Sequence, residues 1–325
     1  MILLLTSSSD TNADLIIAWL KQRDVQYYRL NSDNLLDQYV YLDVHNNVLE
    51  LHDGNLNLDE VTVVWYNKFY GFTKSEYFHT TESKVQPGDL QQLQREFSIL
   101  QDFILRTLKN KTWMLSPFHA SMNKLHNIRA AETAGLHTPR THVVSTKKKL
   151  QELHNSSSLI IKSMYEPYFI TNASGLYSMF TRKVKQEMID KLPDSFFPSL
   201  VQEEVPKVFE IRTFYLHGSM YSMAIFSQAS KFTQEDSRQV DWSNPNRRVP
   251  FMFPKDIEGK IHDLMNDLGL NYGTIDFIMS ESDGEIYFLE INSTGQYGMI
   301  SIPCNYTVYK DIANQLIHMH HGISG

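Results

Sequence analysis

The chain has 325 residues, 42% hydrophobic and 21% charged, which describes a folded protein with core material for two or three packed subdomains. Its net charge of −7 provides no general basic field, so binding to nucleic acid or to an anionic membrane through bulk electrostatics is not expected. The only cysteine, Cys304, excludes an internal disulfide framework and a cysteine-rich zinc site. Because the sequence shows neither a signal-peptide pattern nor an apolar run of ~20 residues, we expect a cytoplasmic protein.

Residues 1–115 are predicted to form a small α/β domain. A buried-strand pattern at Ile2–Thr6 is followed by an amphipathic helix, which is the usual start of such a layer. The further predicted elements are a helix over Asp14–Arg23, strands at Val25–Leu30, Val61–Tyr66 and Trp113–Ser116, a hairpin over Tyr39–Leu51 and a long helix from about Asp89 to Lys109.

Residues 116–199 are predicted to form a second α/β unit. Its first helix is expected to be capped by Ser121 and to stop at Gly135, since glycine commonly ends a helix. The elements expected next are a strand at Thr141–Ser145, a helix at Lys147–His154, a strand at Leu159–Ser163 and a polar, aromatic loop at Tyr165–Thr181.

Residues 200–325 are predicted to form a third unit built around two hairpins. One hairpin turns at His217-Gly218, and the other turns near Ser282-Asp283-Gly284. The predicted elements are a strand at Leu200–Val205, hairpins over Glu210–Ser227 and Gly273–Asn292, a polar loop at Gln228–Arg248, and helices at Lys255–Leu268 and near Thr307–His320.

The second hairpin holds the strongest chemical signal. Glu290 and Asn292 share one face because strand side chains alternate, and a loop centred on Asp283 would place Asp276 directly opposite Glu290. Two facing carboxylates repel one another unless a cation lies between them, and carboxylate and amide oxygens suit Mg²⁺ with its phosphates. An exposed hairpin face with ordinary acids stays open as the alternative.

Two lysines stand out by their context. Lys162 ends the apolar strand Leu159–Lys162, where an amine without an anion would be costly, and Lys124 lies in the first turn of a helix. Both could neutralise a triphosphate, although each taken alone also fits a solvated lysine. Glu210 and Arg212 share one strand face, so the arginine could hold a carboxylate bidentately or form a surface ion pair.

The order of these pieces resembles the ATP-grasp superfamily over nearly the whole chain. The resemblance implies an α/β (α+β) ATP-grasp fold preceded by an N-terminal pre-ATP-grasp α/β domain. It also implies that Lys124 and Lys162 contact ATP phosphates, and that Gln202, Glu203, Glu204 and Val205 line the adenine pocket. Asp276, Glu290 and Asn292 would hold Mg²⁺, with two ions expected.

Within that superfamily the chain most resembles the graspetide peptide maturases of the microviridin and grasp-with-spasm types. The segments that carry the resemblance are Val64-Trp65-Tyr66-Asn67-Lys68, Glu210-Ile211-Arg212, Asp241-Trp242, Asn246-Arg247-Arg248-Val249-Pro250-Phe251 and Asn292-Ser293-Thr294-Gly295-Gln296-Tyr297. Two departures are the single glycine, Gly175, in the loop expected to cover the phosphates, and Glu210 where relatives often carry Asp.

The resemblance implies a ligase that phosphorylates Glu or Asp side chains of a ribosomal precursor peptide. It would then join them to Thr or Ser hydroxyls, or to Lys amines, as macrocyclic ω-esters or amides. Arg212 and Glu210 would be catalytic, and Arg212 with Arg247 or Arg248 would bind the substrate. A homodimer is also implied.

Two other functions stay open on the sequence. A glutamate-adding amino-acid or peptide ligase would share the ATP chemistry but extend a chain through an amine. A non-catalytic nucleotide- or peptide-binding relative would keep the fold, but the presence of all three predicted metal ligands argues against it.

Overall fold

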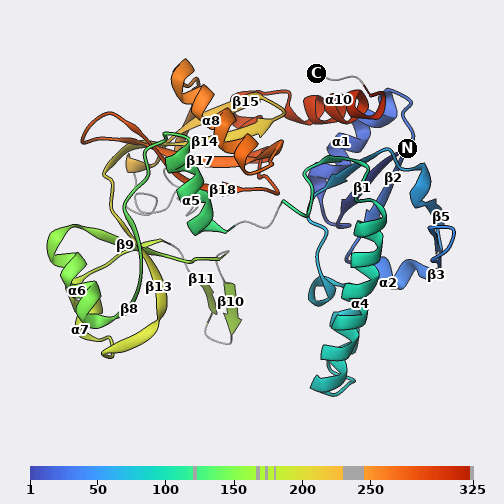
Figure 1. Ribbon diagram of the computed structural model, residues 1–325, viewed down its shortest axis with the longest axis horizontal. Helices are drawn as coiled ribbons and strands as arrows, with labels where there is room; N and C mark the ends of the chain where they lie inside the picture. The colour runs from blue at the N-terminus through green and yellow to red at the C-terminus, as the bar shows by residue number, and fades with distance from the viewer. Residues whose placement is uncertain (120–122, 166–168, 173–174, 179–180, 230–244, 323–325) are drawn as a thin grey trace. The chain divides into compact units, whose positions relative to one another are not determined.

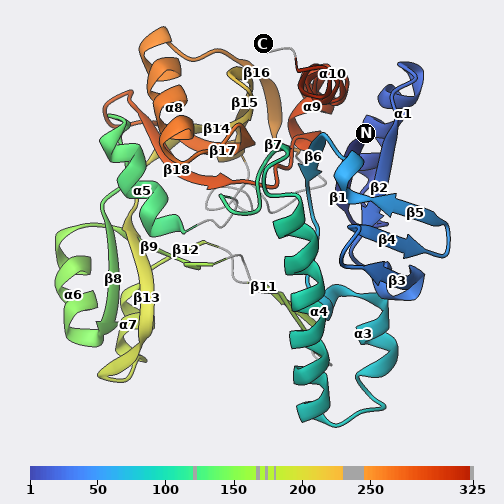
Figure 2. The same cartoon turned by 45° about the vertical axis from the view of Figure 1, so that its right-hand side comes forward.

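The computed structural model describes residues 1–119, 123–165, 169–172, 175–178, 181–229 and 245–322. It divides into two compact units, of which the first combines Met1–Ala120 with Thr307–Gly325 and the second is Ser121–Tyr306. Figures 1 and 2 label many of the elements of both units. The boundaries predicted at residues 115–116 and 199–200 stay predictions, and residue 200 lies inside a strand of the second unit.

The first unit is built on a parallel sheet in the order β2-β1-β6-β7. Its elements are β1 (Ile2–Thr6), α1 (Thr11–Gln22), β2 (Tyr27–Asn31), α2 (Leu35–Gln38), β3 (Tyr39–Asp43), β4 (Val48–Leu51), β5 (Gly54–Asn57), η1 (Leu58–Glu60), β6 (Val63–Tyr66), η2 (Phe72–Lys74), α3 (Glu76–Thr81), α4 (Pro87–Thr107), β7 (Thr112–Met114) and α10 (Val308–His320).

Burial explains why the predicted elements of this unit form. Every residue of β1 is buried, as expected for a central parallel strand covered on both faces. Asp10 caps α1 by accepting a hydrogen bond from the Asn12 N–H. The C-terminal helix α10 packs beside α1 (Figure 1), so the last predicted helix belongs to this unit. β3, β4 and β5 form a small antiparallel sheet, of which the strand β5 was not predicted.

The described part of the second unit contains two antiparallel sheets of four and five strands and the two-stranded hairpin β10-β11. The smaller has the order β12-β9-β13-β8 and is covered by α6 and α7 (Figures 1 and 2). Its elements, with the nearby hairpin β10-β11, are α5 (Lys124–Thr133), β8 (Thr141–Thr146), α6 (Lys147–Ser156), β9 (Leu159–Lys162), β10 (Phe169–Asn172), β11 (Gly175–Ser178), β12 (Arg182–Lys183), α7 (Gln186–Asp190) and β13 (Ser195–Glu203).

The larger sheet has the order β16-β15-β14-β17-β18, and both predicted hairpins are confirmed in it. Its elements are β14 (Lys207–Leu216), β15 (Ser219–Phe226), η3 (Ser227–Ala229), β16 (Arg247–Phe251), α8 (Lys255–Asp267), β17 (Tyr272–Ser280), β18 (Ile286–Asn292) and α9 (Gly298–Cys304). The β14-β15 turn uses positive φ at His217 and Gly218, as the sequence predicts. Figure 2 shows α8 beside this sheet.

Three expectations need correction or limits. Asn123, not Ser121, caps α5, because its side chain accepts hydrogen bonds from the Leu125 and His126 N–H groups. The expected loop at 165–181 contains the strands β10 and β11. Ser121, Asp241-Trp242 and much of the predicted loop at 228–248 lie outside the described residues.

Within the described chain, no helix has both the length and the apolar character that crossing a membrane requires.

Candidate active site

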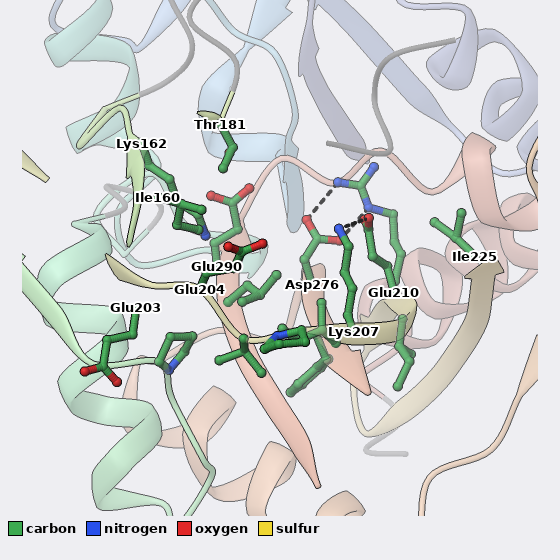
Figure 3. A pocket seen from close by; sticks show the side chains of 18 of the residues that line it. Ile160, Lys162, Thr181, Glu203, Glu204, Lys207, Glu210, Ile225, Asp276 and Glu290 are labelled. Carbon is green, nitrogen blue, oxygen red and sulfur yellow. Dashed lines mark hydrogen bonds and ion pairs between the residues drawn. The ribbon is translucent and has the colours of Figure 1, made fainter. Parts of the chain in front are cut away.

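A cavity of about 620 Å³ lies in the second unit and is lined by strands of both its sheets. β9 and β13 contribute from the smaller sheet, and β14, β17 and β18 contribute from the larger one. Figure 3 shows Lys162, Asp276 and Glu290 in this cavity. Seven basic and six acidic side chains line it. A charged ligand that enters the cavity can therefore replace contacts between these side chains with contacts of its own.

The facing of Asp276 and Glu290 is confirmed, but a bulge produces it. Beyond these residues the hairpin pairs Phe277 with Phe288, so its loop is centred between Ser282 and Asp283. In that register a regular strand would place Leu289 opposite Asp276. A bulge at Leu289 shifts the pairing by one residue and brings Glu290 opposite Asp276. Both carboxylates therefore line the cavity.

Four charged side chains form a row across the floor of the cavity, and this row is called the charge row below. Its order is Lys124, Glu290, Asp276 and Arg212, since Asp276 is the cross-strand neighbour of both Glu290 and Arg212. Arg212 donates from Nε to Oδ1 of Asp276 at 2.7 Å and from Nη2 to Oδ2 at 2.8 Å. Lys124 Nζ lies 3.2 Å from Oε2 of Glu290. Each acid thus has its own cation.

Arg212 is the most deeply buried charge of this row, since only 8% of its side chain is exposed. Burial by itself would lower the pKa of Arg212, but the carboxylates of Asp276, Glu290 and Glu210 raise it above its ordinary value. The guanidinium therefore stays charged. Its Nη1 donates to Gln296 Oε1 at 3.3 Å and contacts Met299 Sδ at 3.4 Å.

The two predicted phosphate lysines both line the cavity, although they come from separate elements. Lys124 is the first residue of α5, and its Nζ also donates to the Ser163 carbonyl at 3.2 Å. Lys162 ends β9, and Figure 3 shows its side chain pointing into the cavity. The fold therefore brings together two lysines that lie far apart in sequence.

The predicted adenine segment is only partly at the cavity. Glu203, Glu204 and Val205 line it, whereas Gln202 is not among the lining residues. Gln202 is 1% exposed, and its Nε2 donates to Thr141 Oγ1 at 2.8 Å. Its cross-strand partner Ile160 does line the cavity, so Gln202 lies on the cavity face of β13, where its buried side chain is held against Thr141.

Glu210 and Arg212 both line the cavity from β14, as their i, i+2 spacing predicts. Glu210 Oε1 accepts from Lys207 Nζ at 2.6 Å and from Ser227 Oγ at 3.0 Å. Lys207 is a cavity residue that the sequence analysis missed. Regular alternation would put it on the other face, but a bulge at Val208 turns it toward Glu210.

Arg248, Arg247 and Asn292 are placed differently from one another. Arg248 lines the cavity, and its buried Nε has no hydrogen-bond partner among the described residues. Arg247 lies over the Phe226 ring at 5.4 Å and is not a lining residue. Asn292 is opposite Thr274 at the end of β18, and it too is absent from the lining.

Lys183 and Lys185 are further cavity lysines that the sequence analysis missed. Lys183 Nζ lies 2.6 Å from Glu204 Oε1, and Ser158 Oγ donates to the other oxygen of the same carboxylate at 2.8 Å. Lysines two positions apart, at 183 and 185, are a weak signal, because exposed lysines often show this spacing.

The donor set fits a magnesium ion through oxygens. The described residues contain no cluster of three or more His, Cys, Asp or Glu side chains able to hold a metal. Asp276 and Glu290 supply two facing carboxylates, and Asn292 follows Glu290 by two residues on the same strand face. Mg²⁺ is commonly held by one or two carboxylates together with substrate phosphates and water, so this smaller set is sufficient.

Comparison with known proteins gives no match to any protein-family model and no match among curated proteins. Solved structures do match. The macrocyclase MdnC from Microcystis aeruginosa MRC, bound with precursor peptide MdnA, has a TM-score of 0.82 and 22% identity, covering 98% of this chain and 99% of that one. The Chryseobacterium gregarium RiPP-associated ATP-grasp ligase, in complex with ADP and a leader and core peptide, has a TM-score of 0.83 and 20% identity, covering 97% and 96%.

The ATP-grasp ligase PsnB, complexed with minimal precursor, Mg and ADP, has a TM-score of 0.75 at 16% identity, covering 98% of this chain and 97% of that one. The chain has the ATP-grasp fold. This agrees with the fold that the sequence motifs predict. The charge row and Glu203–Val205 line one cavity between two sheets of the second unit.

Proposed function

We propose that this protein is an ATP-dependent ligase that activates side-chain carboxylates of a ribosomal precursor peptide. It joins them to Thr or Ser hydroxyls, or to Lys amines, as macrocyclic ω-esters or amides. The observation that supports it best is the charge row, in which the carboxylates of Asp276 and Glu290 face one another. Lys162 and Glu203–Val205 line the same cavity. The solved relatives named above include ligases bound to precursor peptides and to ADP, and one of their complexes contains Mg.

Each part of the cavity has a distinct task in this reaction. ATP, a substrate, supplies the phosphoryl group that turns a carboxylate into an acyl phosphate with a good leaving group, and Mg²⁺ assists that transfer. Asp276, Glu290 and Asn292 would hold the metal. Lys124 and Lys162 neutralise phosphate charge, and Glu203, Glu204 and Val205 border the adenine.

Arg212 orients the substrate carboxylate, because its planar guanidinium can donate two parallel hydrogen bonds to one carboxylate. Arg248 adds a cation at the same cavity wall, whereas Arg247 is directed to the Phe226 ring. Glu210, fixed by Lys207 and Ser227, is the acid nearest to Arg212 on β14 and handles either the nucleophile or the nucleotide ribose. Cavity closure has to exclude water so that the peptide nucleophile captures the activated carbonyl.

The test is co-expression with a short peptide that is encoded next to this protein and contains Thr or Ser and Glu or Asp. Mass spectrometry should show the loss of one water for each bond formed, and purified protein should release ADP only when the peptide is present. Glu290→Gln should abolish both. Glu285→Gln is the matched control, because Glu285 lies on the same hairpin with 54% of its side chain exposed and does not line the cavity.

Other results would indicate other functions. A mass gain of one amino acid would indicate a glutamate-adding ligase, and nucleotide binding without turnover would indicate a non-catalytic relative. Loss of activity in Arg212→Ala tests the orienting role separately, since dehydration of the peptide at the wild-type rate would exclude that role.

We also propose that the protein acts in the cytoplasm as a homodimer, with functional domains 1–115, 116–199 and 200–325. Light scattering of the purified protein tests the dimer, and localisation of a tagged copy tests the compartment. Limited proteolysis with and without ADP tests the domain boundaries, because cleavage concentrates in exposed linkers.

A further inference from the structure

The cations of the charge row are also the residues to which the proposed function assigns substrate binding. Arg212 occupies both oxygens of Asp276, and Lys124 contacts Oε2 of Glu290. The side chains of Asp276 and Glu290 are 18% and 20% exposed, so solvent screens the row weakly. The predicted metal ligands and the predicted substrate cations therefore neutralise one another.

A divalent ion cannot simply be added to this arrangement. It needs oxygens of Asp276 and Glu290, three of which already contact Arg212 or Lys124. It would also sit beside a buried guanidinium and an ammonium of the same sign. Removal of Arg212 from Asp276 without another partner would leave a buried charge unpaired, which is costly. A bound metal must therefore be accompanied by new partners for both cations.

Arg212 has a second set of contacts that can keep it in place. Its Nη1 donates to Gln296 and contacts Met299, and neither contact involves the carboxylate. These residues follow β18 in the chain and lie outside the hairpin that carries Asp276 and Glu290. The guanidinium can turn its Nε and Nη2 edge away from Asp276 while Nη1 stays held at the cavity wall.

We propose that Arg212 and Lys124 are internal counterions that occupy the metal acids until a divalent ion binds, and that metal binding transfers Arg212 to the substrate carboxylate and Lys124 to the nucleotide phosphates. This rests on the proposed function and adds a binding order to it. Metal with nucleotide binds first, and the acidic peptide side chain binds second. Metal binding and the binding of a ligand that holds Arg212 away from Asp276 are thermodynamically reciprocal. Each tightens the affinity for the other by the same factor.

The experiment measures Mn²⁺ binding by electron paramagnetic resonance, with and without ADP, in the full-length protein. Arg212→Ala should bind Mn²⁺ about tenfold more tightly than wild type, because the competitor for Asp276 is gone. Lys207→Ala is the matched control. It removes one cavity cation of the same charge, whose partner is Glu210 rather than a metal acid, and its affinity should stay within about twofold of wild type.

A second variant keeps the test valid if Arg212→Ala does not fold. Arg212→Lys keeps the charge but cannot form the two-pronged contact, so it should show an intermediate gain in Mn²⁺ affinity. Unchanged or weaker Mn²⁺ binding in the folded Arg212 variants, beside measurable binding in wild type, overturns the counterion role. Absence of Mn²⁺·ADP binding in every variant and in wild type overturns the proposed ligase function itself, so the two failures differ.

Discussion

The coupling free energy of the Arg212–Asp276 pair should be several times larger than that of a shorter ion pair on the surface of the same protein. The perturbation is a double-mutant cycle with Arg212→Leu and Asp276→Asn. The comparison cycle uses Lys255→Met and Glu258→Gln, whose charged atoms are 2.5 Å apart in α8. Contact distance alone would rank the Lys255 pair first.

Burial reverses that ranking. The Arg212 and Asp276 side chains are 8% and 18% exposed, whereas the Lys255 side chain is 89% exposed. Two charges about 4 Å apart attract by about 4 kcal/mol at an effective dielectric constant near 20. Desolvation offsets part of this attraction, so we expect a coupling free energy of about 3 kcal/mol. The exposed helix pair should show a coupling of about 0.5 kcal/mol or less.

Hydrogen exchange followed by mass spectrometry is the suitable assay. Global unfolding of a chain with two compact units need not be two-state, whereas exchange reports the opening free energy of β14 and β17 directly. The measurement is made with a chelator present, so that no metal replaces Arg212 at Asp276. A coupling below about 0.5 kcal/mol in β14 and β17 would refute the reasoning that burial strengthens this pair.

Two further predictions concern the larger sheet. Gly273→Ala should destabilise the second unit by about 2 kcal/mol in exchange experiments, because φ is +155° and the new Cβ would lie 3.2 Å from the Asn292 carbonyl oxygen. Gly259→Ala should instead stabilise this unit by up to about 1 kcal/mol, because Gly259 lies in α8 with open space around the new Cβ. Burial lowers the pKa of His217 below its ordinary value of 6.5, so the unfolded chain takes up the proton first as pH falls, and stability should be lost from about pH 6.5 downward. His217→Asn, which tolerates the positive φ, should reduce this loss in melting curves at pH 7.5 and 5.5, and an identical pH dependence would contradict the linkage.

Local pattern was enough to predict most elements outside the cavity loops. β1 forms as predicted because a continuous apolar run suits a strand buried on both faces. The β14-β15 turn forms at His217-Gly218 because a two-residue hairpin turn needs positive φ. The hairpin β10-β11 was missed because its polar, aromatic sequence resembles a loop when it is read without its pairing partner.

The site was predicted less completely, and backbone irregularities explain why. Asp276 and Glu290 were predicted to pair through a loop centred on Asp283. They do pair, but the bulge at Leu289 produces this pairing. Lys207 was missed because the bulge at Val208 reverses its face. A bulge shifts the facing of every residue beyond it, and it leaves no dependable mark in the sequence.

The residue types and their spacing are enough to identify the available chemical groups: two lysines, an acid-rich final hairpin, an arginine on a strand, and an apolar pattern that builds two kinds of sheet. Which of these groups touch depends on how the sheets assemble. Lys124 meets Glu290 across 166 positions of sequence and Arg212 meets Asp276 across 64, and such long-range pairing depends on how whole sheets assemble rather than on any local propensity.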